Sequence, residues 1–127
     1  MLSGSSFVPK QPYAIIGATN NKEKYGNIIM KDLLSKGISI IPINPKHKSI
    51  MGIKCYPTLA SASIKNNIGL IIIVIPPNKA LDIIVEASII GIKELWLQPG
   101  SESEEAIKLC EKHNIKCTMN ACIMTKT

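Results

Sequence analysis

The chain has 127 residues, of which 46% are apolar and only 4% aromatic, and it carries a formal net charge of +6. This length is typical of one domain. The longest apolar run, residues 70–75, is far shorter than the roughly 18 residues of a membrane span, and the N-terminus lacks the apolar core of a signal peptide, so we expect a soluble cytoplasmic protein without a membrane partner.

All fifteen basic residues are lysines. Without arginine the chain cannot form bidentate guanidinium contacts with phosphate or guanine, and its lysines are scattered among few aromatic residues. These features argue against a nucleic-acid partner. The positive charge is compatible either with attraction of a small polyanionic ligand or simply with a soluble surface.

The predicted elements begin with a short N-terminal arm. Residues 1–10 contain Gly, Ser and Pro and little to bury, so we expect a flexible arm, followed by one domain over residues 11–127. The apolar run at residues 13–16 predicts a strand, and Gly17 opens a polar loop after it.

Strands and helices alternate along the rest of the chain. Six strands are expected in all, at residues 13–16, 39–43, 54–56, 70–75, 93–97 and 115–119. The run at 70–75 contains only Leu, Ile and Val between Gly69 and two prolines, which is typical of a central parallel strand. Helices are expected at about residues 25–35, 58–64 and 79–90 and after Ser103.

Several polar residues and glycines mark the predicted helix ends. Thr58, Asn78 and Ser103 are predicted to cap the starts of the second, third and fourth helices. Gly37 and Gly91 are predicted to end the first and third helices, since glycine readily adopts the left-handed conformation found there. The last eight residues, 120–127, are expected to form a short tail.

This alternation requires a parallel sheet with helices on both faces and right-handed crossovers. We predict an α/β fold with a doubly wound, Rossmann-like parallel sheet of strand order 3-2-1-4-5-6. In that order the connections diverge between the first and fourth strands, so a crevice opens at their carboxyl ends. Loops from four strands converge there, which makes this crevice the predicted ligand site.

The loop after the first strand contains part of a dinucleotide-binding fingerprint. Gly17 and Gly26 are present, but the three glycines of G-x-G-x-x-G are not. The amide groups at the start of the following helix favour an anion, so we interpret the loop as a phosphate site. The alternative interpretation is structural: Gly17 ends a strand, and Gly26 permits close packing.

The end of the second strand bears on the identity of the ligand. NAD-binding folds usually carry an acid there to bind the adenosine ribose, whereas this chain has Asn44-Pro45-Lys46. A lysine at this point can pair with a phosphate on the ribose. NADP and coenzyme A both carry such a phosphate, and this reasoning does not choose between them.

Five motifs occur in order along the chain: IIGAT with KYGN, INPK, KCYPTL, VIPP, and LWLQPG with SESEEAIKL. Together they make the sequence over about residues 13–124 resemble the small stand-alone CoA-binding proteins, relatives of the nucleotide-binding domain of succinyl-CoA ligase. Two features differ from these proteins. The loop lacks the T-G-x-x-G run of the ligase subunit, and the C-terminal MNACIM differs from the D-R-C ending common among the small proteins.

The resemblance implies three groups of residues that would contact coenzyme A. The pyrophosphate would be held by Gly17, Ala18, Thr19, Lys24, Tyr25 and Gly26. The ribose 3′-phosphate and the adenosine would be met by Asn44, Pro45 and Lys46, with Tyr56 near the base. The pantetheine path would be lined by Pro76, Pro77, Gln98, Pro99 and Gly100.

The sequence contains no recognisable catalytic constellation. His47 and His113 have no sequence-local Cys or Asp arrangement that suggests a triad, and we interpret both as surface residues. The resemblance also implies that the phosphorylated His of the related ligase subunit belongs to a second domain, which we do not expect in this chain. We therefore expect non-catalytic binding of coenzyme A or acyl-CoA. Two alternatives stay open: an NADP-binding oxidoreductase fragment, and a subunit of a split acyl-CoA ligase that needs a separate partner chain.

The four cysteines lack C-x-x-C spacing, so we expect free thiols and no structural metal. Cys110 lies within an amphipathic helix and is expected in the core. Cys55 and Cys122 lie nearer the carboxyl-end rim. Either could face a CoA thiol, although burial is the simpler interpretation for both.

Overall fold

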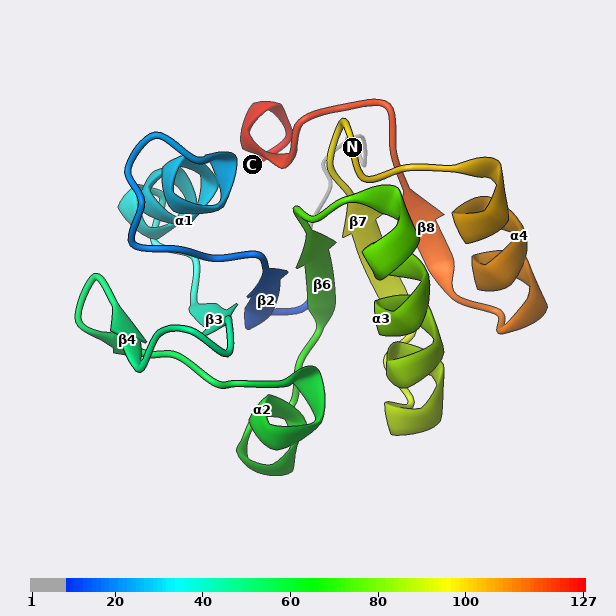
Figure 1. The fold of residues 1–127 in the computed structure, drawn as a ribbon, viewed down its shortest axis with the longest axis horizontal. Helices are drawn as coiled ribbons and strands as arrows, with labels where there is room; N and C mark the ends of the chain where they lie inside the picture. Colours follow the sequence, from blue (N-terminus) through cyan, green and yellow to red (C-terminus); the bar gives the residue numbers. More distant parts are fainter. Residues whose placement is uncertain (1–8) are drawn as a thin grey trace, which may run out of the picture.

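The computed structural model describes residues 9–127 and contains one main parallel sheet (Figure 1). Its five strands lie in the order β3-β2-β6-β7-β8. Their bounds are β2 Tyr13–Ile16, β3 Ile40–Ile43, β6 Leu70–Ile73, β7 Glu94–Leu97 and β8 Lys116–Thr118. Strand β2 pairs in parallel with the edge strand β3 on one side and with the central strand β6 on the other.

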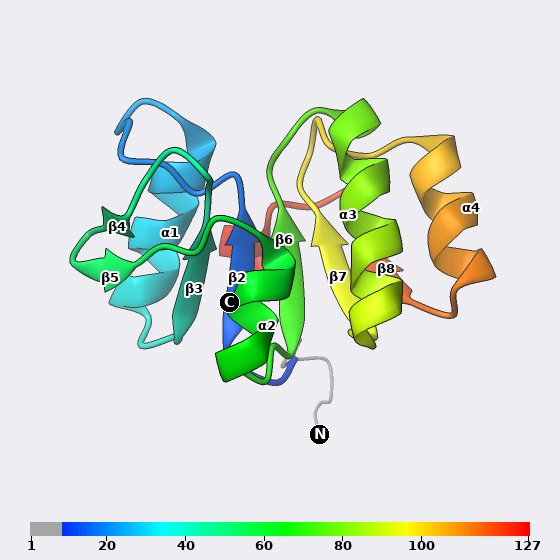
Figure 2. The same ribbon diagram turned by 60° about the horizontal axis from the view of Figure 1, so that its bottom comes forward.

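Helices cover both faces of this sheet (Figure 2). Over residues 9–127 the α-helices are α1 Tyr25–Ser35, α2 Leu59–Lys65, α3 Pro77–Ile90 and α4 Glu104–Lys112, and a 3-10 turn, η1, spans Ile123–Thr125. One face packs against α1 and η1, and the other against α2, α3 and α4. Successive strand residues alternate between the two cores, so Ile72 belongs to the α1 side and Ile71 and Ile73 to the other.

Most of the predicted helix ends are confirmed. The Thr58 side chain accepts a hydrogen bond from Ser61 N in a reciprocal capping box, and the Ser103 hydroxyl accepts one from Ala106 N. Gly91 ends α3 in the left-handed conformation, with φ of 96°. The predicted cap Asn78 is wrong: α3 begins at Pro77, and Asn78 lies inside its first turn, because proline is well suited to the first helical position.

The strand order is confirmed for five of the six predicted strands and wrong for the third. The third strand, expected at residues 54–56, does not form: Lys54 instead ends a separate antiparallel hairpin made of β4 Ser49–Ile50 and β5 Ile53–Lys54. Only Tyr56 reaches the main sheet, through one isolated bridge to Ile43. At this bridge, Tyr56 N donates a hydrogen bond to the carbonyl of Pro42 on the edge strand β3 at 3.0 Å. Pro42 has no N–H and cannot donate a hydrogen bond itself.

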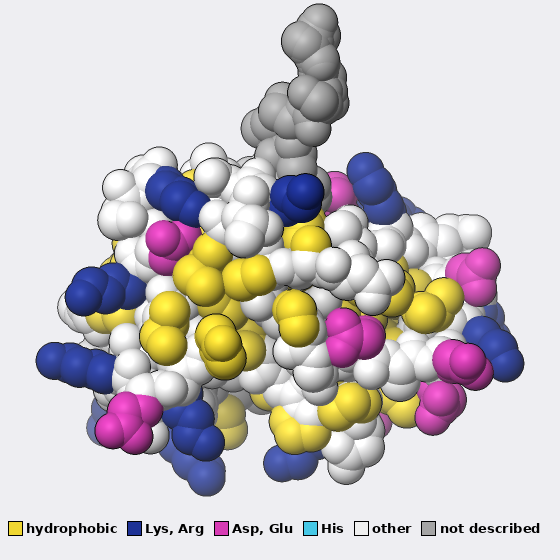
Figure 3. Space-filling model, turned by 90° about the horizontal axis from the view of Figure 1, so that it is seen from above, with side chains coloured by type: hydrophobic (Ala, Val, Ile, Leu, Met, Phe, Trp, Pro, Cys, Tyr) yellow, Lys and Arg dark blue, Asp and Glu magenta, His cyan; other side chains and the backbone are white. Residues whose placement is uncertain are grey.

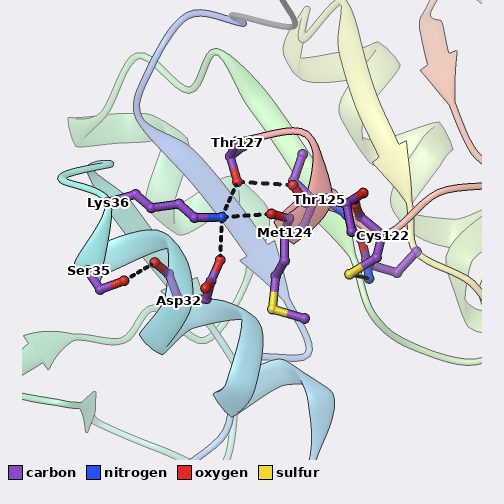
Figure 4. A network of polar contacts seen from close by, with 9 residues as sticks. Asp32, Ser35, Lys36, Cys122, Met124, Thr125 and Thr127 are labelled. Carbon is purple, nitrogen blue, oxygen red and sulfur yellow. Dashed lines mark hydrogen bonds and ion pairs between the residues drawn. The ribbon is translucent and has the colours of Figure 1, made fainter.

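The C-terminal tail packs onto the fold instead of extending from it. Ile123 is fully buried on the α1 side of the sheet. Its amide donates to Gln98 Oε1 at 2.7 Å. Figure 4 shows another attachment: Lys36, the residue after the end of α1, donates from Nζ to the Met124 carbonyl at 2.7 Å and lies 2.7 Å from Asp32 Oδ2.

Two further expectations concern the N-terminal arm and membrane-spanning helices. The flexible arm predicted at residues 1–10 lies outside the described residues except for Pro9 and Lys10. Pro9 is buried, and its carbonyl accepts a hydrogen bond from the Tyr13 hydroxyl at 3.1 Å. None of the helices found over residues 9–127 combines the length and apolar character needed to cross a bilayer.

Candidate functional site

A cleft of about 650 Å³ opens at the carboxyl ends of β2 and β6. From this point the chain leaves β2 toward β3 on one side and β6 toward β7 on the other. Open α/β sheets bind ligands at such a point of divergence, because the loops there part and leave room between them. The predicted position of the crevice is therefore confirmed.

The loop after β2 forms one wall of the cleft. Gly17, Thr19, Lys24, Tyr25 and Gly26 all line it, as the sequence predicts. Gly17 has φ of 102°, and an added Cβ would lie 2.5 Å from the Val74 carbonyl oxygen. A Cβ on Gly26 would overlap the Gly17 carbonyl oxygen. The two glycines thus allow the start of α1 to pack against the loop while both face the cleft.

The two helices that begin at the cleft have no side-chain cap. Lys24 precedes α1 and Pro76 precedes α3, and neither provides a capping hydrogen bond. The first turns of both helices contain no acid. By contrast, α2 and α4 are capped by side chains. Within residues 9–127, the amides of Tyr25 and Gly26 at the start of α1 have no backbone partner and are available to an anionic ligand. The start of α3 offers only the amide of Asn78, because Pro76 and Pro77 have no N–H and Lys79 N donates to the Pro76 carbonyl.

Buried or half-buried amide side chains hold the loop after β2 in place. Asn27 Nδ2 donates to the Thr19 carbonyl at 2.9 Å, and Asn44 Nδ2 donates to the Ala18 carbonyl at 2.8 Å. Asn44 also lines the cleft, as predicted. These bonds tie the loop to α1 and to the end of β3, so the wall of the cleft is formed before any ligand arrives.

His47 is a cleft residue that sequence reasoning missed. It was interpreted as a surface side chain, but it is half-buried and lines the cleft. Its Nδ1 lies 3.0 Å from Asn20 Nδ2, and its Nε2 lies 3.4 Å from the Thr19 hydroxyl. Because Asn20 Nδ2 also donates to the Ser49 carbonyl at 3.1 Å, this orientation of the amide assigns Nδ1 as an acceptor and the proton to Nε2.

The opposite wall is mainly apolar. It contains the predicted residues Pro76, Pro77, Pro99 and Gly100. Val74 and Ile75 also line it, although both were assigned to the strand at 70–75. The strand ends at Ile73, and Ile75 N donates instead to the Ser101 hydroxyl at 3.1 Å. Ser101, a buried residue that the sequence did not single out, therefore joins the loops after β6 and β7.

Four predicted site residues do not line the cleft. Ala18 is fully buried beneath the loop, and Pro45 is exposed beside it. Tyr56 packs at the sheet edge, with Lys54 Nζ 4.9 Å from its ring centre. Gln98 is buried and directs its amide toward the C-terminal tail, where Nε2 lies 3.4 Å from Cys122 Sγ.

The charge of the cleft suits a polyanion. Lys24 and Lys46 line it, and no Asp or Glu is among its lining residues. The backbone amide of Lys46 donates to Asn44 Oδ1 at 2.8 Å, which fixes the turn that presents this exposed side chain. Two cations and the uncapped start of α1 therefore line a cleft whose opposite wall, at the start of α3, is mainly apolar.

The cysteines lie away from this constellation. Cys55 is buried, and burial raises the pKa of its thiol. Cys110 is in the core, as predicted, and its thiol together with burial raises the pKa of Cys117. Cys122 is half-buried beside Gln98. Within residues 9–127 there is no cluster of three or more His, Cys, Asp or Glu side chains arranged to hold a metal ion.

Comparison with known proteins gives a consistent result. A family model described as "CoA binding domain" matches residues 11–127. Among solved structures, a conserved hypothetical protein from Pyrococcus furiosus is 42% identical with a TM-score of 0.87, over 93% of this chain and 100% of that one. A hypothetical protein from Pyrococcus horikoshii OT3 is 30% identical with a TM-score of 0.82, over 90% of this chain and 79% of that one.

The curated relatives are much longer proteins. An ADP-forming acetate–CoA ligase I from Archaeoglobus fulgidus is 32% identical over 92% of this chain but only 18% of its own length. An ADP-forming acetate–CoA ligase from Methanocaldococcus jannaschii is 39% identical over 63% of this chain and 11% of its own length. The chain thus spans less than a fifth of either ligase.

Proposed function

We propose a ligand-binding function on the premise that the chain belongs to the CoA-binding domain family. The protein binds coenzyme A or an acyl-CoA in the cleft between the starts of α1 and α3, and it does not itself catalyse a reaction. The observation that supports this most is the pairing of the uncapped start of α1 with Lys24 and Lys46 in a cleft lined by no acid. A nucleotide with several phosphates complements such a site.

The polarity of the cleft suggests how the ligand lies. The pyrophosphate would contact the loop after β2 and the first amides of α1, with Lys24 beside it. The ribose 3′-phosphate would pair with Lys46. The pantetheine arm, which is largely apolar, would follow the wall formed by Ile75, Pro76 and Pro99. In this arrangement His47 lines the same cleft, with its Nε2 held 3.4 Å from the Thr19 hydroxyl in the loop that would contact the pyrophosphate.

Native mass spectrometry of the protein purified without denaturation tests the proposal. We expect a noncovalent complex with the mass of coenzyme A or an acyl-CoA, and rebinding of added CoA at one molecule per chain. A complex with NADP in its place, and no rebinding of CoA, would contradict the proposal and favour the oxidoreductase alternative.

A second candidate function rests on the curated relatives, which are ADP-forming acetate–CoA ligases. Because this chain matches only a small part of each ligase, it would act as the CoA-binding part of a ligase whose other domains lie on a partner chain. The pure chain, incubated with acetate, CoA, ATP and magnesium, should form no acetyl-CoA by chromatography. Turnover by the pure chain would contradict both the non-catalytic proposal and the need for a partner.

A further inference from the structure

A second cavity, of about 790 Å³, lies over α1 and shares no lining residue with the cleft. Three segments that are far apart in sequence form it: α1 with the loop before it, the Met51 turn between β4 and β5, and the C-terminal tail at Met124. Its volume is within the range of sites that bind small molecules. The loop after β2 separates the two cavities, with Thr19 on the cleft side and Asn20 on the other.

The side chains that give this cavity its apolar surface are accessible, and two of the three are methionines. Ile28 and Met51 are each 39% exposed, and Met124 is half-buried. Figure 3 views the molecule from the side of η1, where hydrophobic side chains gather left of the centre and lysines project along the left edge. Methionine adapts its shape to irregular apolar groups, so this surface suits a flexible hydrocarbon chain better than one rigid ring.

The charged side chains of the cavity are unequal in number. Lys22 and Lys31 line it together with one acid, Asp32. The Asp32 carboxylate lies 2.7 Å from Lys36 Nζ, which also holds the Met124 carbonyl (Figure 4). Among the residues described, the ion pairs are Lys36–Asp32 and Lys116–Glu94, so Lys22 and Lys31 have no carboxylate partner. The cavity therefore presents two unneutralised cations beside an apolar surface.

We propose that this second cavity binds a carboxylate with a flexible apolar chain, of the size of a medium-chain fatty acid. The hydrocarbon chain lies against Ile28, Met51 and Met124, and the carboxylate pairs with Lys22 and Lys31. A second copy of this chain is a poor occupant, since it would bring the same lysines face to face in a protein of net charge +6. The inference does not depend on the ligand of the cleft.

Calorimetric titration with decanoate, kept below its micelle concentration, tests the proposal against two probes of equal chain length, decanol and decyltrimethylammonium. Decanoate should bind at one molecule per chain and roughly tenfold or more tightly than decanol, because a charge-assisted contact is absent from the alcohol. The cationic probe should not bind. Equal affinity for decanoate and decanol would overturn the proposal.

Matched variants locate the site. Lys31→Gln should weaken decanoate binding severalfold, whereas Lys65→Gln at the end of α2 should not change it. Ile28→Ser should weaken binding, whereas Ile64→Ser, at a side chain that is 81% exposed on another helix, should not. Loss of binding in both members of a pair would indicate nonspecific adsorption and overturn the proposal.

A titration of the protein already saturated with CoA separates this inference from the proposed function. Decanoate should bind with the same stoichiometry in the presence of CoA, since the two cavities share no residue. Competition between the two ligands would place decanoate in the cleft and overturn the inference while leaving CoA binding intact. If the protein binds decanoate but not CoA, the proposed function fails and the inference stands.

Discussion

Lys46 is the residue on which the identity of the nucleotide depends most. It lines the cleft at the end of β3, where NAD-binding folds usually carry an acid, and the chain has no arginine that could replace it. A charge-assisted hydrogen bond of this kind is worth about 1.5–3 kcal/mol, or roughly ten- to a hundredfold in affinity. Wild-type protein should therefore prefer CoA to dephospho-CoA by about that factor in calorimetry, and Lys46→Ala should bind both equally weakly.

The neighbouring lysine provides the matched control for this comparison. Lys48 is exposed two residues further along and does not line the cleft. Lys48→Ala should keep the preference for CoA, because general positive charge is reduced equally in both variants. A wild-type protein that binds dephospho-CoA as tightly as CoA would show that Lys46 does not contact the ribose phosphate.

The environment of Tyr13 predicts how the free energy of unfolding changes at alkaline pH. Its hydroxyl donates to the Pro9 carbonyl, and burial, aided by the charge of Glu94, raises its pKa above the ordinary value. As the pH rises through about 10, the unfolded chain loses this proton while the folded chain keeps it. The stability that Tyr13 contributes is thus complete below pH 10 and is lost as the pH approaches the raised pKa.

Urea unfolding of wild-type protein and Tyr13→Phe measures this contribution. At about pH 8 the variant should be less stable by about 1 kcal/mol, the usual value of one hydrogen bond. At about pH 11 the difference should shrink, because only the wild-type protein loses stability through Tyr13. A difference that stays constant between the two pH values would mean that the pKa of Tyr13 is not raised by folding.

At the scale of single elements, local chemistry was enough to predict much of the fold. The Leu/Ile run of β6 and the caps at Thr58 and Ser103 need only neighbouring residues and were predicted correctly, although the strand ends two residues earlier than expected. The hairpin β4–β5 was missed for a local reason as well. Its turn has positive φ at Met51 and Gly52, and Met-Gly is not among the residue pairs that usually mark such turns.

The errors in the site have a different origin. The resemblance implies that Gln98 lines the cleft, but its side chain accepts a hydrogen bond from Ile123, which is 25 residues away in sequence. His47 lies in the cleft because Asn20, in the loop after β2, contacts its Nδ1 and also donates to the carbonyl of Ser49 in β4. Such long-range partners leave no periodic or spacing signal in the sequence, and the directions of these side chains were therefore not predictable. The residues at the strand ends were predictable, because they follow directly from the positions of the strands.

The start of α1 is the element on which the cleft depends. An added Cβ on Gly26 would overlap the Gly17 carbonyl, which is backbone and cannot rotate away. Gly26→Ala should therefore cost about 3 kcal/mol or more and lower the Tm by roughly 10 °C. Gly91→Ala is the control in thermal unfolding, since its Cβ meets nothing within 4 Å and adds only the cost of a left-handed alanine. Equal effects of the two substitutions would mean that the close approach at Gly26 is not the cause.

At the scale of the whole molecule, topology and charge act together. The divergence of the chain between β2 and β6 creates the cleft, and the same divergence aims the starts of α1 and α3 at it from opposite sides. The two helices that face the cleft carry no side-chain cap, whereas α2 and α4 are capped. The fold thus leaves backbone amides free where its lysines gather.

Hydrogen–deuterium exchange with and without saturating CoA tests this account most directly, because it reports on the amides themselves. CoA should slow exchange in residues 17–26 and 74–78, on both sides of the cleft, and leave α4 unchanged as an internal control. Protection confined to α4 or to the Met124 tail, or unchanged exchange in both walls at a CoA concentration that saturates binding, would show that the nucleotide does not occupy the cleft.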